Sequence, residues 1–388
     1  MKSPVKLRSK LPKVGTTIFT KMSALANEHN AINLSQGFPN FDCDPALVSL
    51  ASEYMQKGFN QYCPMQGLLS LRENIAAKVE NLYGIQYNPD TEINITAGAT
   101  QAIFTIISTV ISEGDEVIII EPAYDCYEPA IELMGGVINR VQLQPGTFKV
   151  NWTEVQKMVN QNTKLLIINT PHNPTGTILE ESDMKQLEKI VKGNDLLVLS
   201  DEVYEHIIYD QKKHQSVCLY PSIAEKSFVV FSFGKTFHVT GWKMGYVLAP
   251  EHLMAEFRKV HQYNVFTCNT PFQYALAEYI KNENKFLELP AFYQEKRDYF
   301  TNIIKETQFE ITPCSGTYFM LLGYRQYSDK GDVQFAEELT KKGGVASVPV
   351  SVFYGNKRDD HVLRFCFAKT TDQLDAAGEK LIQLNALV

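Results

Sequence analysis

The 388-residue sequence lacks the features that define several broad classes of protein. It contains no stretch long and apolar enough to span a bilayer, no internal repeat and no low-complexity tract. Its seven cysteines are scattered, odd in number and without a CxxC pair, so we expect no disulfide framework. We interpret them as small apolar side chains in a reducing compartment.

The charge balance is acidic. Acidic residues number 44 against 37 basic ones, giving a net charge of -7, which disfavours nucleic acid or an anionic membrane as the main partner. The first thirteen residues are basic, but no apolar run follows them, as a secretory signal would require. Pro4 and Pro12 also disfavour the amphipathic helix of a transit peptide. We therefore expect a cytoplasmic protein.

What is present is an ordinary globular composition, 44% apolar and 21% charged. The length exceeds what one hydrophobic core usually supports, which predicts two domains. Short β-branched runs alternate with helical patterns, and this alternation is typical of a mostly parallel sheet in a three-layer α/β/α domain. One helix is expected to begin at a Ser182 cap. The expected strands are residues 93–97, 116–120, 165–169, 196–199, 228–231 and 245–248.

The last hundred residues have a different pattern. Helical segments around residues 273–305 precede short strand-like runs, which predicts a smaller α+β domain. We assign residues 46–285 to the large domain and residues 286–388 to the small one. Residues 1–45 are expected to form an N-terminal segment that packs with the small domain or crosses the cleft.

Polar residues follow several predicted strands. In open α/β sheets, ligands bind beyond the carboxyl ends of the strands, so such residues share one rim. Lys235 follows an apolar strand beside Gly234, and a partly desolvated lysine there can form a Schiff base; a solvated surface lysine is an equal alternative. Asp201 ends another strand, where a carboxylate can pair with a ring nitrogen or simply cap a helix.

Two loops complete this rim. Asn173 lies between Pro171 and Pro174, which fix the backbone and could direct its amide, although Asn-Pro is also a common turn signal. Gly98 separates a strand from a helix, and amides at a helix N-terminus bind phosphate; a plain turn is the alternative. The pattern is not GxGxxG, which disfavours a nicotinamide-dependent oxidoreductase.

Together these windows resemble the class I and II aminotransferases, fold-type I enzymes that depend on pyridoxal 5'-phosphate (PLP) and share the aspartate aminotransferase-like fold. The resemblance runs from the Asn-Leu-Ser-Gln-Gly-Phe-Pro window at residues 33–39 to Arg364-Phe365. Windows 121–127 and 201–206 are most similar to the methionine and aromatic aminotransferases and to the kynurenine aminotransferase/cysteine-conjugate β-lyase branch.

The resemblance implies a role for each matching residue around the cofactor ring. Lys235 would form the Schiff base, and Asp201 would pair with the ring nitrogen. Asn173 and Tyr204 would hydrogen-bond the phenolate oxygen, and Tyr124 would stack on the ring face. Lys235, Asp201 and Tyr204 are thus the expected catalytic residues.

The same resemblance implies a phosphate site and a homodimer. Tyr62 would reach the phosphate of the neighbouring subunit. Many relatives have arginine where this chain has Lys243, but a phosphate accepts either cation. The remaining phosphate ligands would be the backbone amides of Thr100 and Gln101, next to Ala99 at the cofactor, with Ser232 and Lys243.

For the substrate, Arg364 would grip the α-carboxylate in a bidentate fork, near Asn173 and the Gly37 backbone. Phe19, with Tyr62 and Tyr124, would form an aromatic wall, although core packing is the more ordinary role for Phe19. No second cation offers itself for a dicarboxylate side chain.

We therefore expect ping-pong transfer of the amino group of an apolar, sulfur-containing or aromatic L-amino acid to a 2-oxo acid. Methionine is favoured, with phenylalanine, tyrosine, kynurenine and glutamine as further donors. Elimination of sulfur from cysteine conjugates at the same site is the nearest alternative. A non-catalytic regulator is disfavoured because Lys235 and Arg364 are both present. We expect no metal, because His172 and His206 lack metal-ligand spacing.

Overall fold

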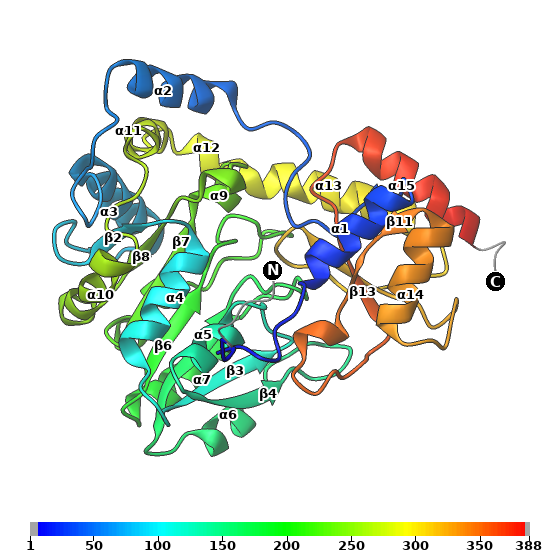
Figure 1. The fold of residues 1–388 in the computed structure, drawn as a ribbon, viewed down its shortest axis with the longest axis horizontal. Coiled ribbons are helices and arrows are strands. Elements are labelled where there is room, and N and C mark those ends of the chain that lie inside the picture. Colours follow the sequence, from blue (N-terminus) through cyan, green and yellow to red (C-terminus); the bar gives the residue numbers. More distant parts are fainter. Residues whose placement is uncertain (1–6, 385–388) are drawn as a thin grey trace.

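The computed structural model describes residues 7–384 and contains a seven-stranded sheet at the centre of its larger part (Figure 1). The strand order is β2-β8-β7-β6-β5-β3-β4; β8 runs antiparallel to both neighbours and all other neighbours are parallel. The expectation of a mostly parallel α/β sheet is confirmed. The strands are β2 (Ile93–Thr96), β3 (Glu116–Glu121), β4 (Val137–Gln142), β5 (Thr163–Asn169), β6 (Leu197–Asp201), β7 (Ser227–Ser232) and β8 (Gly245–Leu248).

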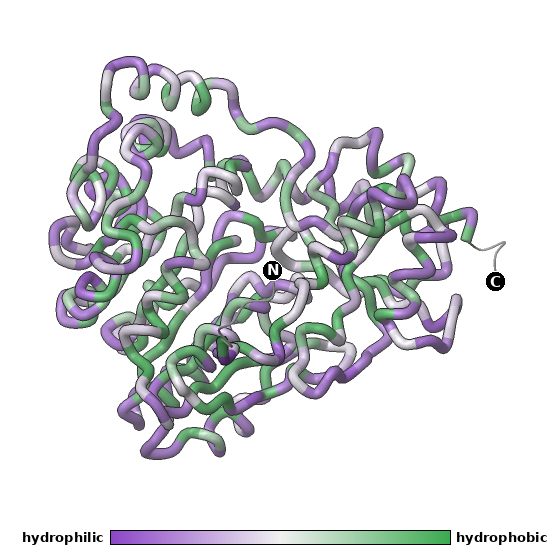
Figure 2. Tube along the Cα trace, viewed as in Figure 1, coloured by the Kyte–Doolittle hydropathy of each residue, from purple (hydrophilic) through white to green (hydrophobic). Residues whose placement is uncertain are grey.

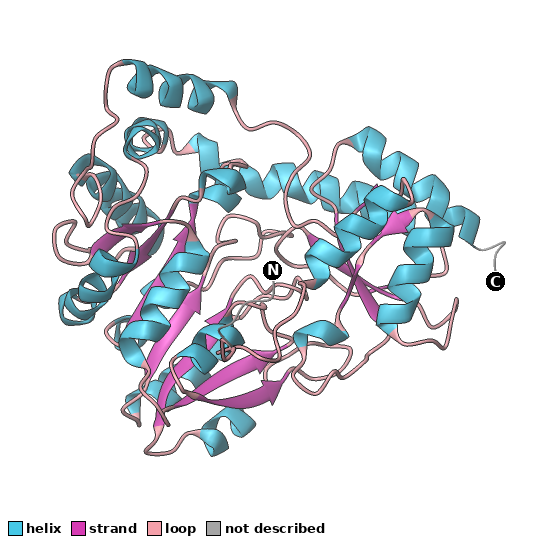
Figure 3. Ribbon diagram, in the orientation of Figure 1, coloured by secondary structure: helices cyan, strands magenta, loops and turns pink. Residues whose placement is uncertain are grey.

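Helices pack on both sides of this sheet (Figure 3). The inner strands are buried along almost their whole length, because helices cover both faces and leave no face for polar side chains. Figure 2 shows apolar residues along these strands and polar residues on the outward helix surfaces. The helices are α2 (Pro45–Gln56), α3 (Leu69–Tyr83), α4 (Ala99–Val110), α5 (Tyr127–Leu133), α6 (Trp152–Met158), α7 (Glu181–Lys192), α8 (Pro221–Ala224), α9 (Phe233–Thr236), α10 (Glu251–Asn264), α11 (Thr270–Tyr279) and α12 (Asn284–Leu287).

Two local predictions need correction. Ser182 does not cap a helix, because α7 begins at Glu181 and Glu180 is its N-cap. Glu180 takes the capping role assigned to the serine, and the Asp183 carboxylate in turn accepts the Glu180 amide at 2.8 Å, which completes a capping box. Strand β4 was not predicted; it lies at the sheet edge, is largely half-exposed, and carries the polar residues Asn139 and Arg140.

The smaller part contains a four-stranded antiparallel sheet in the order β12-β13-β10-β9. The N-terminal helix α1 (Ile18–Glu28) leads to β1 (Ile32–Asn33), which pairs with β11 (Val345–Ala346) of this part. The domain boundaries at residues 45 and 285 stay a prediction. No helix among residues 7–384 has the length and apolarity needed to cross a membrane. The remaining elements are β9 (Glu310–Ile311), β10 (Phe319–Gly323), β12 (Val348–Pro349), β13 (Val362–Cys366), α13 (Leu289–Ile304), α14 (Asp332–Glu338) and α15 (Thr371–Gln383).

Candidate active site

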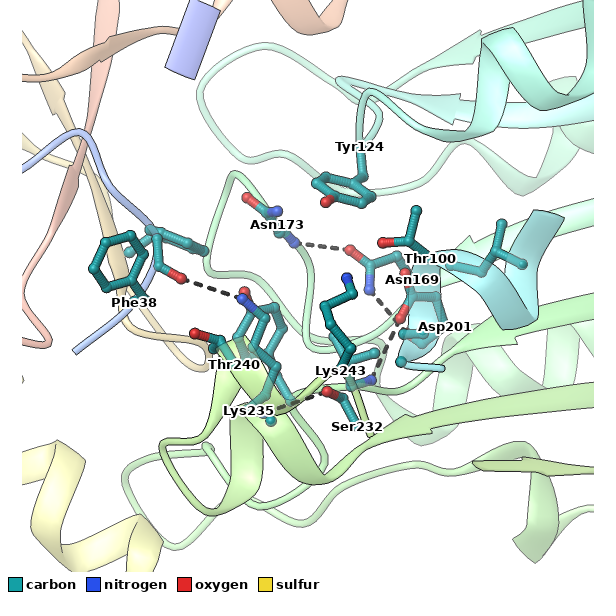
Figure 4. A pocket seen from close by; sticks show the side chains of 18 of the residues that line it. Phe38, Thr100, Tyr124, Asn169, Asn173, Asp201, Ser232, Lys235, Thr240 and Lys243 are labelled. Carbon is teal, nitrogen blue, oxygen red and sulfur yellow. Dashed lines mark hydrogen bonds between the residues drawn. The ribbon is translucent and has the colours of Figure 1, made fainter. Parts of the chain in front are cut away.

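The carboxyl ends of β5, β6 and β7 lie side by side and open into a cavity of about 290 Å³ (Figure 4). Asn169 is the partner of Asp201 in the sheet register, and its side-chain amide donates to the Asp201 carbonyl at 2.8 Å. Except for Gln101 and Tyr62, every predicted site residue lines this cavity. Those residues are Phe19, Gly37, Ala99, Thr100, Tyr124, Asn173, Asp201, Tyr204, Ser232, Lys235, Lys243 and Arg364.

Lys235 enters the cavity from the short helix α9, directly after β7. Its backbone amide donates to the Ser232 hydroxyl at 3.3 Å, which fixes the turn. The Nζ atom donates to the Gly37 carbonyl and to the Tyr318 hydroxyl, each at 3.1 Å. Burial lowers the pKa of Lys235 to about 8, because a desolvated ammonium is disfavoured. More of this amine is thus neutral and nucleophilic near neutral pH than of an ordinary exposed lysine amine.

Asp201 is the last residue of β6 and is buried. Its Oδ2 accepts the Tyr127 hydroxyl at 2.6 Å, and its Oδ1 accepts the Val203 amide at 3.4 Å. Burial raises the pKa of Asp201 to about 6, although the Tyr127 hydrogen bond opposes that shift. Two hydrogen bonds hold this buried carboxylate at the strand end, and among the described residues no cation forms an ion pair with it. Such a carboxylate can pair with a protonated ring nitrogen.

The N-terminus of α4 supplies backbone amides for an anion. Gly98 is its N-cap with φ +77, a conformation that favours glycine, and no side chain caps these amides. A Cβ on Gly245 would lie 3.2 Å from the Ala99 nitrogen, so glycine permits this close approach. Lys243 and Ser232 line the same part of the cavity. The uncapped amides of α4, the Ser232 hydroxyl and the Lys243 cation can together bind a phosphate group.

Arg364 lies on β13 and is buried, yet it forms no ion pair with a carboxylate among residues 7–384. Its Nη1 donates to Asn173 Oδ1 at 2.8 Å and its Nη2 to the Ser35 carbonyl at 3.1 Å. Its Nε has no hydrogen-bond partner in the part of the chain that the structure describes. The guanidinium centre stacks 3.9 Å from the Phe319 ring centroid. A buried, unpaired cation of this kind is costly unless an anion joins it, which suits a substrate carboxylate.

Asn173 and Tyr124 line the cavity that Lys235 enters and lie near each other in Figure 4. The backbone N–H of Asn173 donates to Asn169 Oδ1 at 2.9 Å. Because Arg364 occupies the Asn173 side-chain oxygen, the side-chain N–H groups are left as donors for a ligand. Burial raises the pKa of Tyr204, so its hydroxyl stays protonated and can donate as well.

Two predicted site residues, Gln101 and Tyr62, do not line the cavity. The Gln101 side chain accepts from the Ala97 amide at 2.9 Å and donates to the Thr105 hydroxyl at 2.6 Å, so only its backbone points to the helix end. Tyr62 is 82% exposed and does not line the cavity of its own chain. Its ring packs at 5.3 Å against that of Phe266, which is also exposed.

The sequence did not single out Tyr127, Tyr318, Phe319 or Asn169. Each contacts a predicted residue: Tyr127 binds Asp201, Tyr318 binds Lys235, Phe319 stacks on Arg364 and Asn169 holds Asn173. The only signal for Tyr127 and Asn169 was their place inside windows 121–127 and 169–176. For Tyr318 and Phe319 the sequence showed only a strand-like run.

Comparisons with known proteins agree with this geometry. A family model described as aminotransferase class I and II matches residues 29–381. The methionine aminotransferase of Escherichia coli is 48% identical over 383 residues, covering 98% of this chain and 99% of that protein. Human kynurenine–oxoglutarate transaminase 1 is 33% identical, covering 92% of this chain and 93% of that protein.

The match extends to three dimensions. An E. coli crystal structure reported with a methionine aminotransferase function superposes with a TM-score of 0.96, at 48% identity and with 98% of this chain and 100% of that one covered. The buried lysine, the buried aspartate, the phosphate cradle and the unpaired arginine suit the cofactor of this family. The chain therefore belongs to the class I and II aminotransferases and is a PLP-dependent transaminase.

Proposed function

We propose that this transaminase takes methionine, and with it other apolar or aromatic L-amino acids, as amino donors in a ping-pong reaction with a 2-oxo acid. The observation that carries the proposal is the composition of the cavity wall. Among the described lining residues, the cations are Lys235, Lys243 and Arg364, and the roles proposed above use all three. No further cation among the described residues that line the cavity is left to select a side-chain carboxylate.

Aromatic side chains form the wall instead. Phe19, Phe38 and Tyr124 line the cavity together with Phe319. A thioether packs favourably against aromatic rings and adapts to an irregular apolar space, so this wall suits methionine. The names of the relatives, a methionine aminotransferase and kynurenine–oxoglutarate transaminases, support the same substrate class.

The residues of the chain divide the work. PLP, when bound, supplies an electron sink that acidifies the Cα–H bond of the donor. Arg364 holds the α-carboxylate, and Asp201 stabilises the protonated ring nitrogen electrostatically. Lys235, released by the donor, acts as the base at Cα. Arg364 is buried and Lys235 is half-buried, so little water reaches these charged groups, which strengthens their interactions.

A steady-state comparison tests the donor class. We expect kcat/KM for L-methionine to exceed that for L-aspartate by about 100-fold, since an unpaired carboxylate would enter an aromatic wall. Initial-rate plots at varied donor and acceptor should give parallel lines. Preference for L-aspartate, or intersecting lines, would contradict the proposal. Release of pyruvate and ammonia from a cysteine conjugate, faster than methionine transamination, would favour the lyase.

We further propose a homodimer in which Tyr62 completes the site of the neighbouring subunit. Tyr62 is 82% exposed and Phe266 is 43% exposed beside it, with Tyr263 88% exposed on the adjacent α10. Three exposed aromatic side chains in neighbouring segments are typical of a surface that another subunit covers. In a single chain Tyr62 does not line the cavity, so a phosphate contact would have to come from a second copy.

Subunit mixing tests this arrangement. Lys235→Ala and Tyr62→Ala chains are each impaired in their own dimers. A hybrid dimer contains one site with an intact Lys235 and an intact Tyr62 from the partner, so we expect activity above the sum of the parents after exchange. No gain despite demonstrated exchange would show that Tyr62 does not act across an interface. A cytoplasmic location remains a prediction from the sequence.

A further inference from the structure

Tyr318 is a buried tyrosine in direct contact with the amine of Lys235. It lies just before β10 in the smaller part of the molecule, whereas Lys235 follows β7 of the large sheet. Its hydroxyl donates to the Gly37 carbonyl at 2.7 Å and accepts from Lys235 Nζ at 3.1 Å. The same lysine nitrogen donates to the Gly37 carbonyl at 3.1 Å, so the three polar groups form a closed triangle.

The segment that carries Tyr318 is anchored to the large part of the molecule. The Thr317 amide donates to the Ile207 carbonyl at 2.9 Å, and the Tyr209 amide donates to the Ser315 carbonyl at 3.1 Å. Thr317 itself has φ +63, a conformation that few non-glycine residues adopt without a fixed surrounding. The Tyr318 hydroxyl is therefore held at a defined position relative to Lys235.

The hydrogen bonds of this triangle restrict the orientation of the Lys235 amine. A neutral primary amine has two N–H groups and one lone pair. Gly37 and Tyr318 provide two acceptors at equal distances on the same side of the nitrogen, which draw its N–H groups towards that side and leave the lone pair to face away from it. A base whose lone pair is aimed in advance needs less reorganisation in the transition state than one that rotates freely.

We propose that Tyr318 is a positioning residue that aims the lone pair of Lys235 at the Cα proton of the amino donor. The inference rests on the proposed role of Lys235 as the base. With PLP bound as the electron sink for the Cα–H bond, Lys235 would take the Cα proton and form a new N–H bond. It would later give up that same proton, so no proton is gained or lost.

The phenol suits this position because it remains neutral. Burial raises the pKa of Tyr318 well above its usual value, so its proton stays on the oxygen and goes to Gly37. A tyrosinate there would instead trap Lys235 as an ammonium. Once Lys235 has taken the Cα proton, Tyr318 and Gly37 still accept two of its three N–H groups, which leaves the third free for the return transfer.

The closing experiment compares Tyr318→Phe with Tyr293→Phe in the PLP-loaded enzyme. Tyr293 is also buried, its ring lies 5.7 Å from that of Tyr318, and its hydroxyl has no hydrogen-bond partner among the described residues. The two variants therefore remove the same atom from neighbouring rings, but only one removes an acceptor from Lys235.

For Tyr318→Phe we expect kcat with L-methionine to fall about tenfold or more, while KM stays within about twofold. The isotope effect on kcat with α-deuterated L-methionine should rise, because proton abstraction becomes more rate-limiting. Tyr293→Phe should match the parent in both. An unchanged isotope effect in Tyr318→Phe, or the same change in both variants, would overturn the proposal.

A second readout needs no turnover. In the cofactor-free chain, the rate at which acetic anhydride modifies Lys235 at different pH values reports the pKa of its amine. An acceptor stabilises the ammonium, so Tyr318→Phe should lower this pKa below its starting value near 8, and Tyr293→Phe should not. The charged and titratable groups that face Lys235 are Asp201, Tyr204, Lys243, Arg364 and Cys366, and of these Tyr204 is also a hydrogen-bond partner of Tyr318.

Lys235→Ala, measured in parallel, separates the two possible failures. If that variant keeps its turnover, the proposed base itself is wrong. If turnover is lost there while Tyr318→Phe behaves like Tyr293→Phe, the base stands and only the role of Tyr318 is wrong.

Discussion

The two halves of the active site are built in different ways. On the cofactor side, Asn169, Asp201 and Ser232 end three adjacent strands, so the backbone ladder sets their spacing. On the substrate side, Gly37 and Arg364 come from segments more than 300 residues apart in the chain. Arg364 lies on β13 of the smaller sheet, and its side chain reaches the N-terminal segment through the bond to the Ser35 carbonyl. Changes on the first side should remove chemistry, whereas changes on the second should misplace the substrate.

Lys235→Ala should give the largest effect, because it removes both the attachment point and the base. We expect kcat with L-methionine to fall by about 10⁴-fold or more, measured with saturating PLP. Asp201 and the α4 amides remain, so the protein should still bind PLP noncovalently. Activity within about tenfold of the parent would contradict the assignment of Lys235.

Arg364→Lys tests the substrate side. A lysine keeps the charge but loses the planar fork and its stack on Phe319, so kcat/KM for the donor should fall roughly 10- to 100-fold, mainly through KM. Arg358→Lys is the matched control, since Arg358 pairs with Asp360 away from the cavity. Equal losses in both variants would mean that Arg364 does not bind substrate.

Tyr127→Phe weakens the cofactor side without removing a predicted ligand. The Tyr127 bond opposes the upward shift that burial gives Asp201, so its loss should raise the pKa of Asp201 above about 6. A smaller fraction is then ionised at a given pH. We expect the dissociation constant for PLP, followed by fluorescence, to rise about tenfold near pH 6.5 and less at pH 8.5. A rise independent of pH would argue for a purely steric effect.

Lys78→Met should spare catalysis altogether. Lys78 Nζ lies 2.5 Å from Glu205 Oε1 behind the cavity, and both side chains are buried. Removing one partner leaves an uncompensated charge, so the free energy of unfolding should fall by about 3–5 kcal/mol, while kcat of the folded enzyme stays near the parent value. Lys185→Met breaks an exposed pair with Glu181 and should cost less than about 1 kcal/mol.

The effect of Lys78→Met on the free energy of unfolding should depend on pH. Burial alone would raise the pKa of Glu205, but Lys78 and His206 outweigh it and hold the pKa below its usual value. This stabilisation is present above the unfolded-state pKa, roughly 4, and is lost as the pH falls. The difference in unfolding free energy between Lys78→Met and the parent should therefore hold above about pH 5 and shrink only as the pH falls below about 4. A constant difference would implicate lost packing of the lysine stem instead.

The sequence predicted some parts of the structure better than others. The inner strands were predictable because their apolar runs are continuous, and the residues that end them share a rim by the rules of parallel sheets. The edge strand β4 was missed because half-exposed Asn139 and Arg140 break its pattern. The cap was placed two residues too late, at Ser182, because Glu180 and Asp183 form a reciprocal capping box without a serine.

By itself, then, the sequence determined the α/β architecture, the family and the residues at the strand ends, since local periodicity and short motifs encode them. Tertiary structure alone brought Tyr127 to Asp201, Tyr318 and Gly37 to Lys235, and turned Gln101 and Tyr62 away from the cavity. Periodicity states which face of an element is buried. Which distant side chain meets that face, and which polar atom it satisfies there, depends on how the elements pack against one another.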